Sequence, residues 1–167
     1  GGRALPSAFG HAHPARDAAA ALTASCDDYF WHIGEAMYNA KQADALKIFG
    51  NRMGMGVKTG IDLPGEQSGF IPDPDSKQQQ EGTAWGVGDT LNIVIGQGNT
   101  TVTPIQEARM MMAIANGGTL YKPYVVRSVG KSGEAPSYVA PKQDNPQTLG
   151  FEKTDLNALR AALYELL

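Results

Sequence analysis

Apolar residues recur at helical spacing in several separate parts of this 167-residue chain. The segment from Ala15 to Ala24 is rich in alanine, which predicts a first helix, and a second helical pattern begins at Asp27. On this second helix we expect Phe30, Ile33 and Met37 to form the buried stripe, because they lie on one helical face. The joint between the two helices is therefore a short turn.

A third helix is predicted over Lys41 to Met53, with Leu46, Phe49 and Met53 on its buried side. The glycines that follow it break the helical pattern. The region from Thr59 to Gly98 is rich in Gly, Pro, Asp and Gln, and its spacing supports no long regular element. We therefore expect mostly loops and turns there.

The helical pattern returns at Thr103, which is expected to be the N-cap of a further helix. Pro104 suits the first helical position, because its missing N–H has no partner there in any case. The buried face of this helix is expected to consist of Ile105, Ala108, Met112 and Ala115. Asn116, Gly117 and Gly118 should end the helix.

The last part of the chain combines a strand, a polar segment and a helix. Leu120 to Val129 is predicted to be a strand, in which Pro123 favours an edge position or a bulge. Gly130 to Pro146 is polar and rich in turn residues. A final helix places Leu156, Leu159, Leu163 and Leu166 on one face and reaches Leu167 without a cap. Together with the glycine pair at the start, this favours a fragment over a naturally short domain.

The composition excludes some classes of function but does not identify one. The chain is 42% hydrophobic and 19% charged, which is typical of a globular chain with one core. Its 14 basic and 17 acidic residues give a net charge of -3, and no cationic run indicates nucleic-acid binding. No stretch approaches the roughly 18 apolar residues of a membrane span, and the first residues do not resemble a secretion signal. The single cysteine, Cys26, excludes an internal disulfide.

Ser25 and Asp27 lie in the turn between the first two helices. Either side chain could cap the second helix by accepting a backbone N–H. Such a turn would also hold the Ser25 hydroxyl at a fixed place. From their position alone, helix capping is the simpler interpretation of both residues.

Six strings, in order, resemble the transpeptidase domain of elongation-type class B penicillin-binding proteins. They are Ser25-Cys26-Asp27-Asp28-Tyr29-Phe30, Thr59-Gly60-Ile61-Asp62-Leu63-Pro64-Gly65-Glu66, Gly88-Asp89-Thr90, Ile95-Gly96-Gln97-Gly98, Thr103-Pro104-Ile105-Gln106 and Ala113-Ile114-Ala115-Asn116-Gly117-Gly118. The resemblance covers roughly Gly10 to Val129, and the remainder is compatible with it.

The resemblance implies an α/β fold like that of the serine β-lactamases, of which this chain supplies mostly the helical lobe and few strands. Residues 1–167 would then be a partial transpeptidase domain. Residues 1–12 would be a leader or linker, 15–129 the helical lobe with the Ser-x-Asp motif, and 130–167 a turn-rich segment with the terminal helix.

Enzymes of this family use a Ser-x-x-Lys nucleophile motif, a Ser-x-Asn-like motif and a Lys-Thr-Gly or Lys-Ser-Gly strand. The resemblance identifies Ser25-x-Asp27 as the second motif, in which Ser25 would pass a proton to the departing D-alanine nitrogen. Asp27 would contact substrate. It stands where the family usually has asparagine and cannot donate a hydrogen bond, although aspartate is common in the elongation subgroup.

Two further matches are rejected on structural grounds. Ser128-Val129-Gly130-Lys131 fits Ser-x-x-Lys but ends a strand and enters a turn, whereas the nucleophile motif should open a buried helix. Lys58-Thr59-Gly60 spells the third motif but lies in a loop leading to Pro64, not on a sheet-edge strand. The true partners are expected before Gly1 and after Leu167.

Cys26 also raises a metal hypothesis, because its thiolate with His13, and with His11, could supply zinc ligands. Some elongation-type relatives use a histidine and a cysteine at similar spacing together with upstream aspartates, which have no clear match here. A small buried thiol at the helix junction and a histidine in the leader is the preferred interpretation. No cofactor is expected.

The expected function is therefore part of a peptidoglycan D,D-transpeptidase, which cross-links stem peptides through a serine acyl-enzyme during cell elongation. The resemblance implies D-Ala-D-Ala peptides as substrates, β-lactams as inhibitors, and a glycan polymerase and scaffold proteins as partners. The parent would be anchored by an N-terminal membrane helix, with this domain in the periplasm or outside the cytoplasmic membrane. The alternatives are an inactive homologue that binds peptide or a partner protein, and a purely structural fragment.

Overall fold

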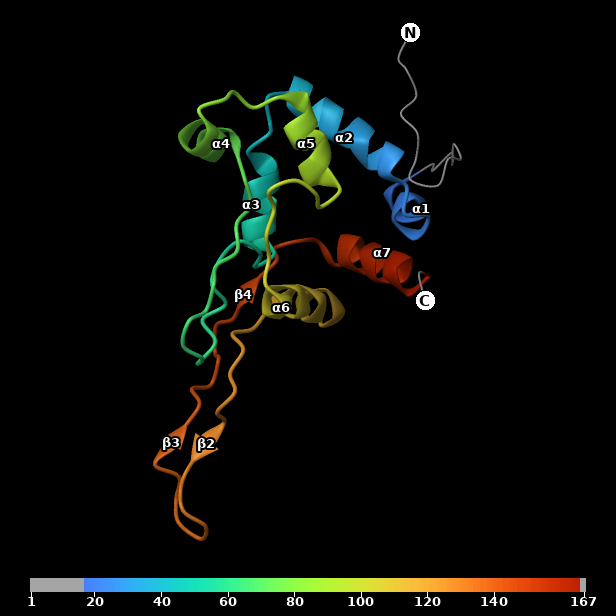
Figure 1. Cartoon of the computed structure of the whole chain (residues 1–167). Helices are drawn as coiled ribbons and strands as arrows, with labels where there is room; N and C mark the ends of the chain where they lie inside the picture. The colour runs from blue at the N-terminus through green and yellow to red at the C-terminus, as the bar shows by residue number, and fades with distance from the viewer. Residues whose placement is uncertain (1–16, 166–167) are drawn as a thin grey trace.

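The computed structural model describes residues 17–165. The helices are α1 (Ala18–Thr23), α2 (Asp27–Asn39), α3 (Ala45–Arg52), α4 (Pro74–Glu81), α5 (Val87–Val94), α6 (Pro104–Ala115) and α7 (Lys153–Tyr164). The strands are β1 (Thr119–Leu120), β2 (Ser128–Val129), β3 (Tyr138–Val139) and β4 (Gln147–Thr148). In Figure 1, α2, α4 and α5 lie at one end, α6 and α7 in the middle, and the β2–β3 hairpin at the other end. Within residues 17–165, no helix has the length and apolar character needed to cross a bilayer.

The principal core lies between α6, α7 and a short ladder in which β1 and β4 pair antiparallel. Its fully buried members are Ala113, Ile114, Leu120, Leu149 and Leu156. Three of the leucines predicted for the terminal helix are confirmed, since Leu156 lies in this core and Leu159 and Leu163 pack against it, whereas Leu166 lies outside the described residues. The end of the chain thus returns to the helices, and α7 also contacts α1.

Residues 121–146, which we call the arm, connect β1 to β4 and project away from the helices (Figure 1). Within the arm, β2 and β3 pair antiparallel, with Ser128 opposite Val139. The strand predicted over Leu120 to Val129 is therefore correct only at its ends. Between β1 and β2, side chains bind the backbone of Tyr121, Lys122, Val125 and Val126, and the Arg127 carbonyl accepts the N–H of Ala140.

Helices α2 and α5 pack closely because α2 has a glycine at the contact. A Cβ on Gly34 would lie 3.1 Å from Val94 Cγ1 and 3.3 Å from Leu91 Cδ2. The predicted stripe on α2 is only partly correct, since Phe30 and Met37 are half-buried while Ile33 is exposed. The glycine determines which face meets α5, because it permits the shortest distance between the two backbones.

Helix α3 is shorter than predicted, and its buried residue is again a glycine. Gly50 is buried against Ile71, whereas Phe49, expected in the core, is 46% exposed. Leu46 and Met53 are half-buried.

Most of residues 59–98 lie in loops and turns, as predicted, but the region also contains two short helices, α4 and α5, which were not predicted. Helix α4 begins with a capping box, in which Asp73 accepts the N–H of Ser76 and the Ser76 hydroxyl accepts the N–H of Asp73. It ends at Gly82, whose φ of 67° is left-handed. The helix buries none of its residues, so it has no hydrophobic periodicity that a pattern search could detect.

Helix α6 has the predicted ends, with Thr103 as N-cap, Pro104 first and Asn116 as C-cap, but its buried face is different. The buried residues are Gln106, Arg109, Ala113 and Ile114. Of the residues predicted to be buried, Ala108, Met112 and Ala115 are exposed and Ile105 is half-buried.

The buried face of α6 includes two polar side chains because both bind backbone groups of other segments. The Gln106 amide donates to the carbonyls of Val57 and Ser68, each at 2.7 Å, and accepts the N–H of Thr103. Arg109 Nε donates to the Tyr121 carbonyl at 2.6 Å. The buried face of α6 therefore contains polar residues, whereas an entirely apolar face was predicted.

Removing a core side chain should test this account of stability. Leu149 is fully buried, so Leu149→Ala is expected to lower the free energy of unfolding by about 2–5 kcal/mol, measured by urea denaturation. The matched control is Ile48→Ala on α3, which is 60% exposed and should change stability by less than about 0.5 kcal/mol. Equal losses for the two variants would contradict the assigned core.

Candidate active-site turn

Ser25 lies at the surface in the turn between α1 and α2, where the sequence predicted it. Its φ is 47°, a left-handed conformation that is uncommon for a residue with a side chain. Two backbone hydrogen bonds maintain the turn, from the Ser25 N–H to Leu22 and from the Cys26 N–H to Ala21. Such backbone strain is often found at functional sites.

The capping role considered for Ser25 and Asp27 is wrong. Cys26 is the N-cap of α2 and makes no side-chain capping bond, and Asp27 is the first helical residue. Within residues 17–165, neither the Ser25 hydroxyl nor the Asp27 carboxylate has a hydrogen-bond partner. The Asp27 charge is favourable near the positive end of the α2 dipole.

The structure brings Ser25 and Asp27 together where α1 gives way to α2. The nearest groove along the chain lies between α1 and α7, where Leu22, Leu159 and Ala162 contribute to its lining. Ser25 is exposed and Asp27 half-buried, so a molecule can approach the turn from solvent.

The zinc hypothesis remains a prediction. Cys26 is buried, with 3% of its surface exposed, whereas His11 and His13 lie outside the described residues. Within residues 17–165, no group of three potential metal-ligating side chains is present.

Glu66 organises the loop that contains Lys58-Thr59-Gly60. Its carboxylate accepts the N–H and the hydroxyl of Thr59, both at 2.6 Å, and the N–H of Gly60 at 3.0 Å. The Thr59 hydroxyl is the main cause of the lowered pKa of Glu66, and the two backbone bonds act in the same direction. This segment is a closed loop and not a strand, which confirms the rejection of its match to the third motif.

Asp62, four residues earlier, connects the same loop to the arm. Its carboxylate accepts the backbone N–H of Val125 at 2.7 Å and that of Val126 at 3.0 Å. These two bonds lower the pKa of Asp62, chiefly through Val125. On the other side of the arm, the Gln143 amide bonds the N–H and the carbonyl of Lys122. Side chains thereby replace the missing ladder partners.

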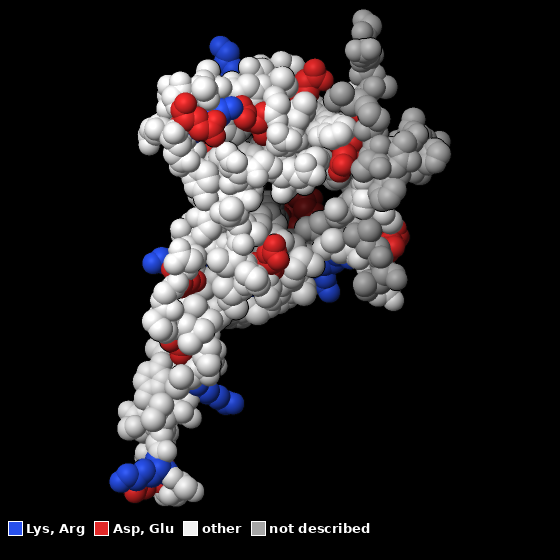
Figure 2. Space-filling view, in the orientation of Figure 1, with Lys and Arg blue, Asp and Glu red and all other residues white. Residues whose placement is uncertain are grey.

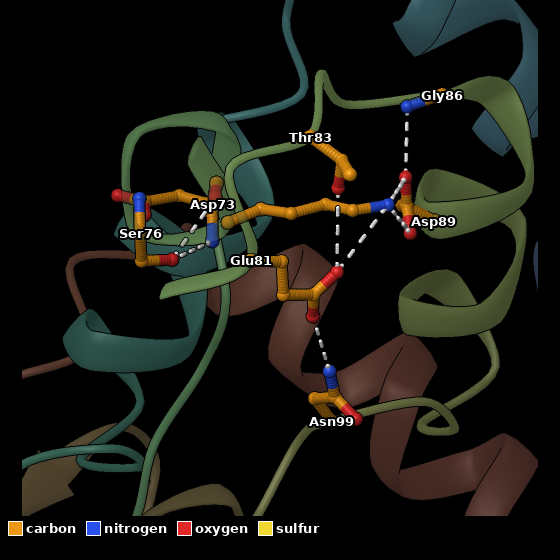
Figure 3. Close-up of polar contacts among 8 residues, drawn as sticks. Asp73, Ser76, Glu81, Thr83, Gly86, Asp89 and Asn99 are labelled. Atoms are coloured by element: carbon orange, nitrogen blue, oxygen red, sulfur yellow. Dashed lines mark hydrogen bonds and ion pairs between the residues drawn. The ribbon is translucent and has the colours of Figure 1, made fainter. Parts of the chain in front are cut away.

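A polar network fixes α5, the helix that packs on α2 (Figure 3). Lys77 Nζ donates to both oxygens of Asp89, at 2.6 and 2.7 Å, and lies 4.0 Å from Glu81. Asp89 also accepts the N–H of Gly86 at 2.7 Å. Burial of Asp89 acts to raise its pKa, but the bonds from Lys77 and Gly86 outweigh it, so that the pKa is lowered.

Two further contacts extend the network. Asn99 donates to Glu81 at 3.1 Å, which joins the end of α4 to the loop after α5 (Figure 3). The indole of Trp85 donates to the hydroxyl of Thr90, a fully buried residue, at 2.8 Å. No pattern in the sequence indicates this role of Lys77. The proline after Asp73 was a usable signal, because Asp-Pro often begins a helix.

Comparison with known proteins identifies relatives of this chain. The family model described as the penicillin binding protein transpeptidase domain matches residues 7–165. The peptidoglycan D,D-transpeptidase MrdA of Acinetobacter baumannii is 31% identical over 147 residues, covering 88% of this chain and 21% of the relative. MrdA of Escherichia coli K12 is 34% identical over 122 residues, covering 73% of this chain and 19% of the relative. The chain thus spans about a fifth of the length of these relatives.

Solved structures share the fold. A Helicobacter pylori complex of the penicillin-binding protein PBP2 with MreC contains a chain of TM-score 0.68 and 32% identity, covering 88% of this chain and 25% of that one. Pseudomonas aeruginosa PBP2 in complex with WCK 5153 has a TM-score of 0.72 and 26% identity, covering 87% of this chain and 31% of that one. The predicted α/β transpeptidase fold, represented here by a helix-rich part with few strands, is confirmed.

The carboxylate of Asp62 should make the order of the arm dependent on pH. Because its pKa is lowered in the folded chain, its contribution is complete above the ordinary value of 3.8 and is lost as the pH falls through the lowered value. NMR spectra should therefore show constant amide shifts of Val125 and Val126 at neutral pH and a change only in acid. Asp62→Ala should speed amide exchange at both residues at pH 7, whereas Asp144→Asn, in the exposed pair with Lys142, should not. Unchanged exchange in Asp62→Ala would contradict this assignment.

The Lys77–Asp89 pair should stabilise the junction of α4 and α5. Lys77→Met is expected to cost about 1–3 kcal/mol in unfolding free energy, because it leaves a partly buried carboxylate without its charged donor. A double-mutant cycle with Asp89→Asn should show coupling between the two positions. Lys142→Met, which removes a pair exposed on both sides, serves as the control and should leave stability unchanged. Additive effects of the two changes would disprove the pairing.

Proposed function

Because this chain belongs to the penicillin-binding protein transpeptidase family, we propose that it is part of a peptidoglycan D,D-transpeptidase that cross-links stem peptides through a serine acyl-enzyme. The names of its relatives support this activity, and the exposed Ser25 turn is the observation that supports a site within the chain. The substrate would be the D-Ala-D-Ala end of a stem peptide, and β-lactams would acylate the same nucleophile.

In the proposed reaction, a serine outside these 167 residues attacks the carbonyl carbon of the penultimate D-alanine and loses its proton to a base. When the tetrahedral intermediate collapses, the peptide C–N bond breaks and the departing D-alanine nitrogen requires a proton. Ser25 donates that proton and takes another from a neighbouring cationic lysine, also outside this chain. A hydroxyl suits this relay because it donates and accepts at once.

Asp27 would contribute by accepting a hydrogen bond from the substrate. It lies at the start of α2, next to the turn, and its carboxylate can only accept when ionised. A backbone N–H of the stem peptide is a suitable donor. The left-handed backbone at Ser25 would keep the hydroxyl and this carboxylate in a constant relative position.

The nucleophile is placed outside the chain because the one matching motif here has the wrong geometry. Ser128 begins the two-residue strand β2 in the exposed arm, and Lys131 follows in a turn. A lysine must lie one helical turn from the serine to act on it. For the organisation of the chain we propose a leader or linker at residues 1–12, a helical lobe at 15–129, and a turn-rich segment with the terminal helix at 130–167.

The parent would act at the periplasmic or extracytoplasmic face of the membrane, held by an N-terminal helix outside this segment. It would work with a glycan polymerase and a scaffold protein of the elongation machinery. The solved complex of a related PBP2 with MreC supports a protein partner, as does a peptidoglycan synthase complex with a TM-score of 0.58 and 26% identity.

Fluorescent penicillin tests both the activity and the role of Ser25. The full-length parent should become covalently labelled, whereas this chain alone should not. In the parent, Ser25→Ala should slow acylation by roughly 100-fold or more, because proton transfer by a positioned group contributes at least that much. Ser25→Gly should be equally slow, although glycine adopts the left-handed backbone without strain.

Ser128→Ala is the matched control and should acylate at the normal rate, with thermal unfolding of each variant checking that the fold is retained. An unlabelled parent would favour the inactive homologue. Labelling of this chain alone would show that Ser25 or Ser128 is itself a nucleophile and would overturn the assignment.

A further inference from the structure

Trp85 lines two neighbouring grooves of the surface. The first, which we call the Lys77 groove, lies between α4 and α5 and has a volume of about 180 Å³. The second, which we call the Tyr38 groove, lies between the end of α2 and the start of α4 and has a volume of about 610 Å³. The larger volume is within the roughly 300–1,000 Å³ typical of small-molecule sites. One aromatic side chain thus joins two places at which a ligand can be held.

The position of Trp85 is fixed by a buried partner. Its indole N–H donates to the hydroxyl of Thr90 at 2.8 Å, and Thr90 is fully buried on α5. Trp85 itself is half-buried. Because the N–H has its partner inside the protein, the part of the indole that a ligand can contact is the apolar ring. A ring that is already fixed loses little conformational entropy when a ligand binds to it.

Amide and hydroxyl groups surround this ring. Gln80 of α4 and Asn92 of α5 line the Lys77 groove and are exposed. Tyr38 and Asn39 line the Tyr38 groove from the end of α2. An amide offers both donors and acceptors, so that it can bind the hydroxyl and acetamido groups of a sugar. A sugar ring also has an apolar C–H face, which requires an aromatic surface of the kind that Trp85 provides.

The half-buried carboxylates of the two grooves are already paired with lysines. Asp89 lies 2.6 Å from Lys77, and Asp73 lies 2.7 Å from Lys47. Figure 2 shows acidic side chains beside a basic one at the end of the molecule that carries α4. The other carboxylates of the lining are exposed, so that solvent screens them; they are Asp44, Asp75 and Glu81. An uncharged ligand therefore suits the grooves better than a polycation, which would compete with both lysines.

The grooves lie at a distance from the Ser25 turn that corresponds to the length of a stem peptide. Ser25 precedes α2, whereas Tyr38 and Asn39 are at its other end, and the 13 residues of this helix span about 20 Å. An extended peptide of about four or five residues spans roughly 13–18 Å. A stem peptide whose end reaches Ser25 would therefore have its glycan strand at a comparable distance.

We propose that Trp85 and the two grooves beside it bind the glycan strand of peptidoglycan, with one sugar ring against the indole and the neighbouring sugar in the Tyr38 groove. The inference rests on the proposed function, because a D,D-transpeptidase acts on stem peptides that glycan strands carry. Helix α4, which contributes to both grooves, buries none of its residues and is polar along most of its length, as is typical of an element that faces solvent.

Saturation-transfer NMR on the full-length parent, with a chain of three N-acetylglucosamine units as the probe, tests this proposal. The trisaccharide should bind, and Trp85→Ala should weaken its affinity about tenfold, because stacking on an aromatic ring contributes roughly that much. Trp85→Phe should weaken the affinity less, since it keeps an aromatic ring and loses only the bond to Thr90. Thermal unfolding of each variant checks that the fold is retained.

Two neighbouring glutamines of α4 provide a matched pair that does not disturb Trp85. Gln80 lines the Lys77 groove, whereas Gln79, which is also exposed, lines neither groove. Gln80→Ala should weaken trisaccharide binding several-fold, and Gln79→Ala should leave it unchanged. Both variants should unfold at the temperature of the parent, because α4 buries neither side chain.

Penicillin labelling of the same parent separates this inference from the proposed function. A parent that is labelled but does not bind the trisaccharide would refute the glycan site alone, and one that binds it without being labelled would refute the proposed activity alone. Equal affinities in Gln80→Ala and Gln79→Ala, or an undiminished affinity in Trp85→Ala, would also overturn the glycan site. So would displacement of the trisaccharide by tri-lysine that weakens as salt is added, which would identify a cationic segment as the ligand.

Discussion

The buried amide of Gln106 connects three segments of the chain, two of which also meet in the Phe70–Thr101 bridge. It binds the carbonyls of Val57 and Ser68 and the N–H of Thr103, so that one side chain satisfies three backbone groups. An unpaired backbone group in this position would cost about 1–3 kcal/mol. Because α6 carries the amide at its first turn, the middle loop and the principal core have a common support.

At the surface, carboxylates likewise connect segments of the chain by accepting hydrogen bonds from backbone N–H groups. Glu66 closes its own loop through Thr59 and Gly60, and Asp62 holds the arm through Val125 and Val126. Asp89 holds the start of α5 and is itself bound by Lys77. Long loops and two-residue strands become ordered in this way, since a side-chain acceptor replaces a missing ladder partner.

The proposed relay residue depends on this support through helix packing. Ser25 precedes α2, α2 packs on α5 across Gly34, and the Lys77–Asp89 pair fixes the start of α5. Two backbone hydrogen bonds hold the turn itself, and Ser25 is exposed among the described residues. A group that transfers protons to a substrate requires this combination of a rigid backbone and a free side chain.

By itself, the sequence determined the family, the Ser25 turn, the ends of α6 and the leucine face of α7, because each depends on local signals such as motif order, capping residues and helical spacing. It did not reveal α4, which has no apolar face, or the buried face of α6, where Gln106 and Arg109 replace the predicted Ile105 and Met112. Only the tertiary structure decided these two features. A polar side chain such as that of Gln106 is buried when backbone groups distant in sequence become its hydrogen-bond partners, and an apolar side chain stays exposed when no other segment packs against it.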